Sequence, residues 1–181
     1  VDAIADLKKA GMAAYALDVN DPDQAESVMQ QVLDSEKRID VLVNNAGYAL
    51  IGPALELPPE ALLKQFETNV FSAIFLARTA APAMKTQKKG LIINIGSISG
   101  IAATPFAGAY CAAKAALHSL SDSMRMELAP FGIHVLTVQP GKIRTGFGKA
   151  AEATISGVLA PGSWYAGIEE GIVQRAQESQ V

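Results

Sequence analysis

Cysteine is nearly missing from this chain: Cys111 is the single one among 181 residues. One thiol cannot form an internal disulfide, so a disulfide-stabilised fold is excluded, and the composition favours a reducing compartment. Long apolar runs are missing as well. No stretch approaches the roughly 18 uninterrupted apolar residues that a membrane-spanning helix needs. We therefore expect a cytoplasmic protein without a membrane span.

Charge is also scarce. Asp, Glu, Lys and Arg together make up 18% of the residues, the net charge is −3 and the pI is near 5.4. A nucleic-acid partner requires a basic surface, so the sequence predicts no such partner. The two histidines, His118 and His134, have no partner at metal-ligand spacing, and we expect no metal site.

Apolar residues are plentiful, and they fall into alternating short and long segments. Half of the residues are hydrophobic, which is enough for a single domain with one core. Short β-rich runs predict strands at 13–17, 39–44, 91–95 and 133–138. Helical periodicity predicts helices at 1–10, from 22 onward, and at 58–84, 109–129 and 169–177. The strands lack polar–apolar alternation, which is typical of a doubly wound parallel sheet with helices on both faces, an α/β fold.

Several polar and glycine-containing motifs directly follow the expected strands. In an open α/β sheet, ligands bind at the carboxyl ends of the strands, so motifs at these positions meet at one edge. They are Asp18-Val19, Asn44-Asn45-Ala46-Gly47, Ser97 and Pro140-Gly141. The sequence therefore predicts a ligand site at this edge of the sheet.

Tyr110 and Lys114 lie four residues apart at the start of an expected helix, so their side chains share one face. A phenol ionises near pH 10, and an adjacent ammonium lowers that pKa towards the working range of an acid–base catalyst. Such a pair also occurs as ordinary packing along a helix. Ser97, 13 residues earlier, adds a hydroxyl that can hydrogen-bond a substrate oxygen. It can equally be a turn residue next to Gly96 and Gly100, and both interpretations can hold.

The order of these motifs resembles the short-chain dehydrogenase/reductase family over residues 11–148. The residues in family order are Asn44-Asn45-Ala46-Gly47, Asn69, Ser97, Tyr110, Lys114 and Pro140-Gly141. Three segments are similar to the branch near the 17β-hydroxysteroid dehydrogenases and related ketoreductases: Asn45-Ala46-Gly47-Tyr48, Thr104-Pro105-Phe106 and Ile143-Arg144-Thr145-Gly146-Phe147. The resemblance implies a Rossmann-like fold and a nicotinamide cofactor.

The resemblance also implies a role for each matching residue. Tyr110 is then the general acid/base, Ser97 orients the substrate oxygen, and Lys114 holds the nicotinamide ribose and lowers the pKa of Tyr110. Asn69 helps to anchor a water that relays protons from Lys114, or else it is a polar residue that bends or hydrates its helix. The implied cofactor-binding residues are Asp18 and Val19 at the adenine, then Asn44, Ala46, Gly47, Tyr110 and Lys114, and around the nicotinamide Pro140, Gly141, Ile143 and Thr145.

The sequence departs from the family pattern at its ends. The glycine-rich turn that cradles the pyrophosphate has no match, and neither has the second strand, whose end selects NAD or NADP. We therefore expect a domain truncated at both ends, with the remaining cofactor half in 1–100 and the catalytic helix and substrate side in 101–181. The expected cofactor is NADP or NAD, with a lean to NADP. A smaller departure is Gly96, where serine is frequent in the family.

These residues together predict an oxidoreductase that transfers a hydride between NAD(P)(H) and a secondary alcohol or ketone of apolar character. Homodimers or homotetramers are expected, because family members often pair through the helices at 58–84 and 109–129. Two alternatives stay open. One is a cofactor-binding or regulatory protein that keeps the fold without turnover, and the other is a dimerisation module built on the Ala-rich helix.

Overall fold

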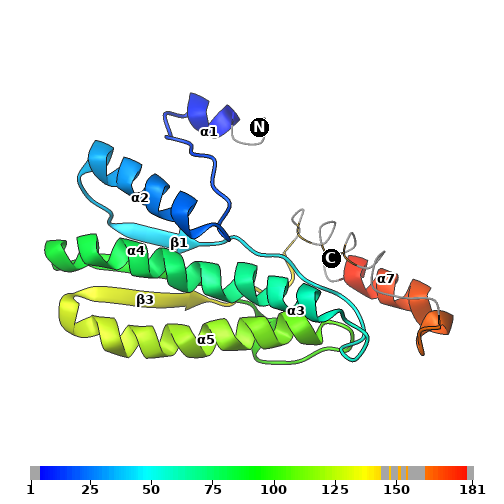
Figure 1. The fold of residues 1–181 in the computed structure, drawn as a ribbon. Helices are drawn as coiled ribbons and strands as arrows, with labels where there is room; N and C mark the ends of the chain where they lie inside the picture. Colours follow the sequence, from blue (N-terminus) through cyan, green and yellow to red (C-terminus); the bar gives the residue numbers. More distant parts are fainter. Residues whose placement is uncertain (1–4, 144–146, 148–150, 152–153, 155–161, 179–181) are drawn as a thin grey trace.

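A computed structural model of the chain describes residues 5–143, 147, 151, 154 and 162–178 (Figure 1). One parallel sheet has the strand order β1-β2-β3, with β1 Val41–Asn44, β2 Gly90–Ile95 and β3 Ile133–Val138. The longer helices are α2 Pro22–Glu36, α3 Pro59–Phe66, α4 Ser72–Gln87, α5 Gly108–Leu128 and α7 Glu169–Glu178. The shorter ones are α1 Ala5–Lys9, a π-helix Glu67–Phe71 and 3-10 turns at Ile98–Gly100, Ala129–Phe131 and Ala166–Ile168. The predicted α/β fold with a parallel sheet is confirmed.

Helix α2 begins where the sequence predicts. Asp21 Oδ1 accepts hydrogen bonds from the backbone N–H groups of Asp23 (3.0 Å) and Gln24 (3.1 Å), and Gln24 Nε2 donates back to Asp21 Oδ2 (2.7 Å). Pro22 fits the first helical position because no N–H donor is needed there. This cap satisfies donors that the first helical turn leaves unpaired. Capping depends on neighbouring residues alone, so the boundary is readable from the sequence.

The helix expected at 58–84 is a continuous helical run that contains a π-turn. Helix α3 passes into the π-helix at Glu67, and α4 begins directly after Phe71. A π-turn inserts an extra residue into the helix and is frequent at functional sites. Asn69 lies inside this turn and is 2% exposed. The predicted irregularity of this helix is therefore centred on the residue that the family resemblance singles out.

The hydrophobic core lies on one face of the sheet. Side chains of α2, α4 and α5 pack there against Ile92 of β2 and against Ile133 and Val135 of β3. In Figure 1, α4 and α5 run along the strands, and β3 is seen between them. On the opposite face Val43 and Leu136, which flank Ile93 in the strand register, are 52% and 51% exposed.

The expected cover of helices on both faces is thus found on one face only, within the residues that the structure describes. The reason is the direction of the chain across the sheet. From β1 to β2 to β3 each strand is added on the same side of the previous one. Right-handed crossovers that advance in one direction place their helices on one face.

The strand expected at 13–17 is wrong. This segment has no regular secondary structure, and its residues Ala13, Tyr15 and Ala16 are exposed. A β-prone run becomes a strand only where a neighbour supplies hydrogen-bond partners, and among the described residues β1 pairs with β2 alone. By contrast, Gly11 takes the left-handed φ of +85° that its place after a helix predicts.

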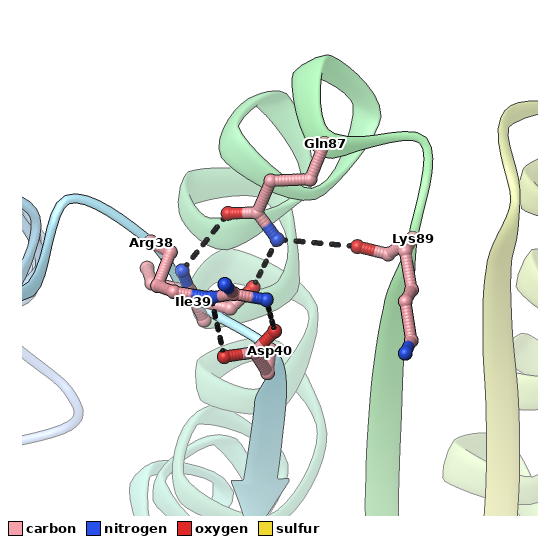
Figure 2. A network of polar contacts seen from close by, with 5 residues as sticks. All are labelled: Arg38, Ile39, Asp40, Gln87 and Lys89. Carbon is pink, nitrogen blue, oxygen red and sulfur yellow. Dashed lines mark hydrogen bonds and ion pairs between the residues drawn. The ribbon is translucent and has the colours of Figure 1, made fainter.

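A polar clamp closes the end of the sheet at which β1 and β2 begin (Figure 2). Gln87, the last residue of α4, accepts a hydrogen bond at Oε1 from the Ile39 N–H (3.1 Å). Its Nε2 donates to the carbonyl oxygens of Ile39 (2.9 Å) and Lys89 (3.2 Å). Beside it, Arg38 Nε lies 2.8 Å from Asp40 Oδ2 in an ion pair. The clamp joins the end of α4 to the residues that precede β1 and β2. It therefore fixes the amino ends of these strands, while the motifs lie at their carboxyl ends.

Candidate active site

Ser97 follows β2 directly and caps the 3-10 turn at 98–100. Its Oγ accepts a hydrogen bond from the Ser99 N–H (3.1 Å). The Ile98 N–H donates to the carbonyl oxygen of Pro140 (3.0 Å), which joins this turn to the residues after β3. The interpretation of Ser97 as a turn residue is therefore confirmed. Because Oγ acts as the acceptor in the turn, its O–H remains a donor for a substrate oxygen.

Tyr110 is the third residue of α5, and its side chain is half-buried next to Ser97. Burial raises the pKa of the Tyr110 phenol above its ordinary value of 10.0, and a hydrogen bond with the Ser97 side chain offsets part of this rise. The ring faces that of Phe147 at 5.7 Å between centroids. At neutral pH the phenol therefore carries its proton and is equipped to donate it.

Lys114 lies one helical turn after Tyr110 and is 5% exposed. Its Nζ donates a hydrogen bond to the carbonyl oxygen of Ile95 (2.6 Å) and lies 5.8 Å from the centre of the Tyr110 ring. Burial lowers the pKa of Lys114 from 10.5 to about 8. The net shift of the Tyr110 pKa in this structure is upward, and the lowering of this pKa by Lys114 stays a prediction. The ammonium is directed at the carbonyl of Ile95 at the end of β2, and burial of the phenol is the largest effect on the pKa of Tyr110.

Asn69 holds the loop that follows β1. Its Nδ2 donates to the carbonyl oxygen of Tyr48 (2.8 Å), and its Oδ1 accepts from the Tyr48 N–H (3.1 Å). Gly47 lies against the same amide, because a Cβ at this position would stand 3.2 Å from Asn69 Oδ1. The side chain of Asn69 is thus committed to positioning this loop. Its part in a water relay stays a prediction.

The sequence interpretation overlooked Gln65, which supports the same loop. Gln65 is fully buried, its Oε1 accepts from the Leu50 N–H (2.7 Å), and its Nε2 donates to Tyr48 O (3.0 Å). A signal was present in the sequence, because Gln65 lies four residues before Asn69 and so shares its helix face. Two buried amides on one helix face therefore fix the segment from Tyr48 to Leu50.

Asn44, at the end of β1, is directed into the core of the site. Its Nδ2 donates to Asn94 Oδ1 (2.8 Å) and to Ala73 O (3.2 Å). Asn94 in turn donates to Ser121 Oγ of α5 (2.8 Å). Asn44 Oδ1 is buried without a hydrogen-bond partner among the described residues. The side chain of Asn44 therefore joins β1 to β2 and α4, and Asn94 continues these bonds to α5, whereas Ala46, two residues on, is exposed at the strand end.

The remaining predicted cofactor residues divide between this edge and the segment before α2. Pro140 and Gly141 follow β3 beside the Ser97 turn, with a Cβ at Gly141 standing 3.8 Å from Ile98 Cδ1. Ile143 is 59% exposed just beyond them, and Thr145 lies outside the described residues. Asp18 and Val19 do not follow a strand, and they lie next to the start of α2, where Asp18 N–H donates to Gln24 Oε1 (3.1 Å). Their role at an adenine stays a prediction.

The donor set at this edge fits a nicotinamide nucleotide. An ammonium carries three donors, and Ile95 O accounts for one of those of Lys114, which leaves donors for ribose hydroxyls. Gly47 and Gly141 present backbone without a side chain at the ends of β1 and β3. Within the described residues, no three His, Cys, Asp or Glu side chains gather closely enough to hold a metal ion. In the same part of the chain, no helix combines the length and apolar character that crossing a membrane requires.

The chain is similar in sequence to known dehydrogenases and reductases. A family model described as short chain dehydrogenase matches residues 1–156. A 3-ketodihydrosphingosine reductase of Bacteroides thetaiotaomicron is 39% identical over 132 residues, which cover 72% of this chain and 49% of that protein. The 17-beta-hydroxysteroid dehydrogenase type 1 of Homo sapiens is 35% identical over 131 residues, which cover 72% of this chain and 39% of that protein. The chain spans about half the length of the curated relatives it matches.

Solved structures agree with this similarity. A short-chain dehydrogenase from Streptomyces avermitilis has a TM-score of 0.84 at 36% identity, covering 99% of this chain and 66% of that one. An NAD+-bound xylitol dehydrogenase has a TM-score of 0.78 at 28% identity, covering 98% and 69%. ElxO with NADP bound has a TM-score of 0.72 at 32% identity, covering 80% and 58%. The last two neighbours hold NAD+ and NADP, which supports a nicotinamide cofactor. The chain belongs to the short-chain dehydrogenase/reductase family of NAD(P)-dependent oxidoreductases, and its Rossmann-like fold is that of the family.

Proposed function

We propose that the protein containing this chain transfers a hydride between NAD(P)(H) and a secondary alcohol or ketone, with Tyr110 as general acid/base. One observation carries the proposal: the Tyr110 phenol and the Ser97 hydroxyl lie close enough together, at the carboxyl end of β2, for the hydroxyl to lower the pKa of the phenol. Two neighbouring hydroxyl groups can both reach one substrate oxygen. The buried ammonium of Lys114 behind them supplies the positive charge that such a proton transfer needs.

The chemistry follows from the protonation state of these groups. When bound, the nicotinamide supplies or accepts the hydride at the substrate carbon. In the reduction direction Tyr110 gives its proton to the substrate oxygen while Ser97 donates a hydrogen bond to the same atom. The raised pKa of Tyr110 keeps the phenol protonated at neutral pH, which supports donation to a carbonyl oxygen. Lys114, with Nζ 5.8 Å from the ring, stabilises the phenolate that the transfer leaves.

An apolar substrate fits the surroundings of Tyr110. Phe147 faces the Tyr110 ring, and Ile98 and Ile143 present exposed apolar side chains beside the Ser97 turn and after β3. Names of relatives point the same way: a 3-ketodihydrosphingosine reductase, a 17-beta-hydroxysteroid dehydrogenase type 1 and a retinol dehydrogenase 8. The proposed substrate is therefore a ketone or secondary alcohol on a largely hydrocarbon skeleton.

The proposal extends to cofactor, assembly and compartment. Residues 1–100, with Tyr110 and Lys114, hold NADP or NAD, and 101–181 supply the catalytic helix and the substrate side. The protein is a cytoplasmic homodimer or homotetramer paired through α4 and α5. Exposed apolar side chains on these helices support such pairing, with Phe71 directly before α4 at 55% exposure and Met126 on α5 at 66%.

The test uses the whole protein, with a panel of ketones and secondary alcohols and with each nicotinamide in turn. Turnover is followed by the absorbance of the reduced nicotinamide. We expect turnover in the unmodified protein, a loss of at least about 100-fold in Tyr110→Phe, and no change in Tyr15→Phe, which alters an exposed tyrosine that is not among the site residues. Equal activity of Tyr110→Phe and the unmodified protein would sink the mechanism. Cofactor binding without turnover of any substrate would favour the non-catalytic alternative.

A further inference from the structure

Gly96 and Gly100, on either side of the turn that begins at Ser97, both lie against the imidazole of His118; Gly96 also lies near Thr137, and Gly100 near the backbone of Lys114. A Cβ at Gly96 would stand 2.2 Å from His118 Nε2, and a Cβ at Gly100 would stand 2.5 Å from His118 Cε1. Both distances are far shorter than non-bonded carbon and nitrogen atoms allow. Any side chain at either position would force the imidazole out of its place. Gly96, which departs from the serine frequent in the family, is therefore explained by His118.

The imidazole makes a hydrogen bond to Ser97, the residue directly after Gly96. His118 Nε2 accepts from the backbone N–H of Ser97 (3.3 Å). The same residue carries the hydroxyl that acts on the pKa of Tyr110. His118 lies four residues after Lys114 on α5, so Tyr110, Lys114 and His118 follow one another along one face of this helix. The helix that carries the general acid thus also holds the backbone of the hydroxyl that works with it.

We propose that His118 is a positioning residue for the reaction: by accepting the Ser97 N–H in the space left by Gly96 and Gly100, it sets the position of the Ser97 hydroxyl relative to Tyr110. This inference rests on the proposed function of the site. His118 does not touch the substrate oxygen and acts through Ser97 alone. Because a misplacement of about 1 Å at a reacting group costs up to about 100-fold in rate, a single backbone hydrogen bond at this point affects turnover.

The bond requires a neutral imidazole, since a protonated one has no acceptor atom. Burial lowers the pKa of His118, the positive charge of Lys114 lowers it further, and Asp122 acts in the opposite direction. These two charged groups both lie on α5, and the turn from Gly96 to Gly100 carries no charged residue. The lowered pKa favours the neutral form at neutral pH. The hydrogen bond from Ser97 N–H to His118 is therefore present at and above pH 6.5. It is lost only when the pH falls below the lowered pKa that His118 has in the folded protein.

The first experiment compares His118→Leu and His118→Gln in the whole protein, with His134→Leu as matched control. Leucine fills a similar volume without an acceptor, and the glutamine Oε1 can replace Nε2 as acceptor. We expect kcat of His118→Leu to fall about 10- to 100-fold with a much smaller change in KM, because Ser97 acts on the reacting oxygen. His118→Gln should recover most of that kcat and lose the fall in activity at acid pH. His134 is exposed on β3, so His134→Leu should change neither value.

The second experiment tests the shape of the space. Gly96→Ser should lower kcat while His118 is present, because its Cβ displaces the imidazole. In a His118→Ala background the same Gly96→Ser change should have a much smaller effect, because only the contact with Thr137 Cγ2 at 3.1 Å remains, which gives a large coupling between the two sites. Additive effects of the two substitutions would contradict the proposal. A His118→Leu variant that keeps both its kcat and the fall in activity at acid pH would contradict it as well.

A third measurement separates this inference from the proposed function. In ¹⁵N NMR spectra at neutral pH, His118 should show the neutral form with its proton on Nδ1, and the Ser97 amide should exchange more slowly than in His118→Leu. A protonated His118, or a Ser97 amide equally protected in both proteins, would overturn the positioning role even in an active enzyme. If the unmodified protein has no turnover, the proposed function fails, while these spectra still decide whether the hydrogen bond exists.

Discussion

Replacing Lys114 with methionine should stabilise the folded protein while it abolishes activity. The ammonium is 5% exposed and is held by one backbone carbonyl, that of Ile95. Methionine keeps the length of the side chain and removes the buried charge. Since the charged form is the one that burial disfavours, the substitution removes a cost from the folded state. Turnover should be lost because no ammonium remains beside Tyr110.

The size of the effect follows from the pKa of Lys114, which falls from 10.5 to about 8 on folding. Each unit corresponds to about 1.4 kcal/mol, so the charged lysine destabilises the cofactor-free protein by about 3 kcal/mol at pH 7. The substitution also removes the hydrogen bond to Ile95 O, which lowers the stability of the folded protein by about 1 kcal/mol. Lys114→Met should therefore raise the free energy of unfolding by about 2 kcal/mol at pH 7.

The pH dependence gives the sign of this effect a separate check. Between about pH 8 and 10.5 the unfolded chain binds the lysine proton and the folded protein does not, so the unmodified protein gains stability as the pH rises. The advantage of Lys114→Met should vanish over this interval. Urea unfolding of both proteins without nucleotide, at pH 7 and at pH 10, measures the difference directly. A variant that is less stable than the unmodified protein at pH 7 would refute the reasoning.

Two further predictions separate the frame of the fold from the site. Gln87→Leu removes the three hydrogen bonds of the clamp in Figure 2 and should lower the free energy of unfolding by about 2 kcal/mol without changing kcat, because the clamp lies at the opposite end of the strands. Gln31→Leu, on the exposed side of α2, is its control and should stay within about 0.5 kcal/mol. Gln65→Leu leaves the buried Leu50 N–H unpaired and should cost about 1–3 kcal/mol. Unlike Gln87→Leu, it should also raise the KM for the nicotinamide, since it loosens the loop after β1. Urea unfolding and steady-state kinetics check both, and a kcat loss in Gln87→Leu with unchanged stability would contradict the first.

The features that the sequence predicts correctly are those set by neighbouring residues. Asp21 and Gln24 cap α2 through bonds that span three positions. Strand β3 matches its expected range of 133–138, because its apolar run lies between clear breaks in the pattern. The strand expected at 13–17 fails because a strand depends on a partner from elsewhere in the chain. The sequence predicts that Asn69 can bend its helix, but only the structure shows that the irregularity is a π-turn.

By itself the sequence determines which chemical groups the proposed site contains and in what order: Ser97, then Tyr110 and Lys114 one helical turn apart. It also places them at the carboxyl end of a parallel sheet, because helical spacing and strand–helix alternation are local patterns. Tertiary structure alone decides what these groups do to one another. Burial raises the pKa of Tyr110, and the direction of Lys114 towards Ile95 prevents the lysine from reversing that shift.

The same division holds for Gly96 and His118. In the sequence they are an unusual glycine and an unpaired histidine, 22 positions apart. In the fold they lie within contact of each other and of Ser97. Desolvation, steric exclusion and hydrogen bonding between distant segments depend on distances through space, which no spacing along the chain encodes.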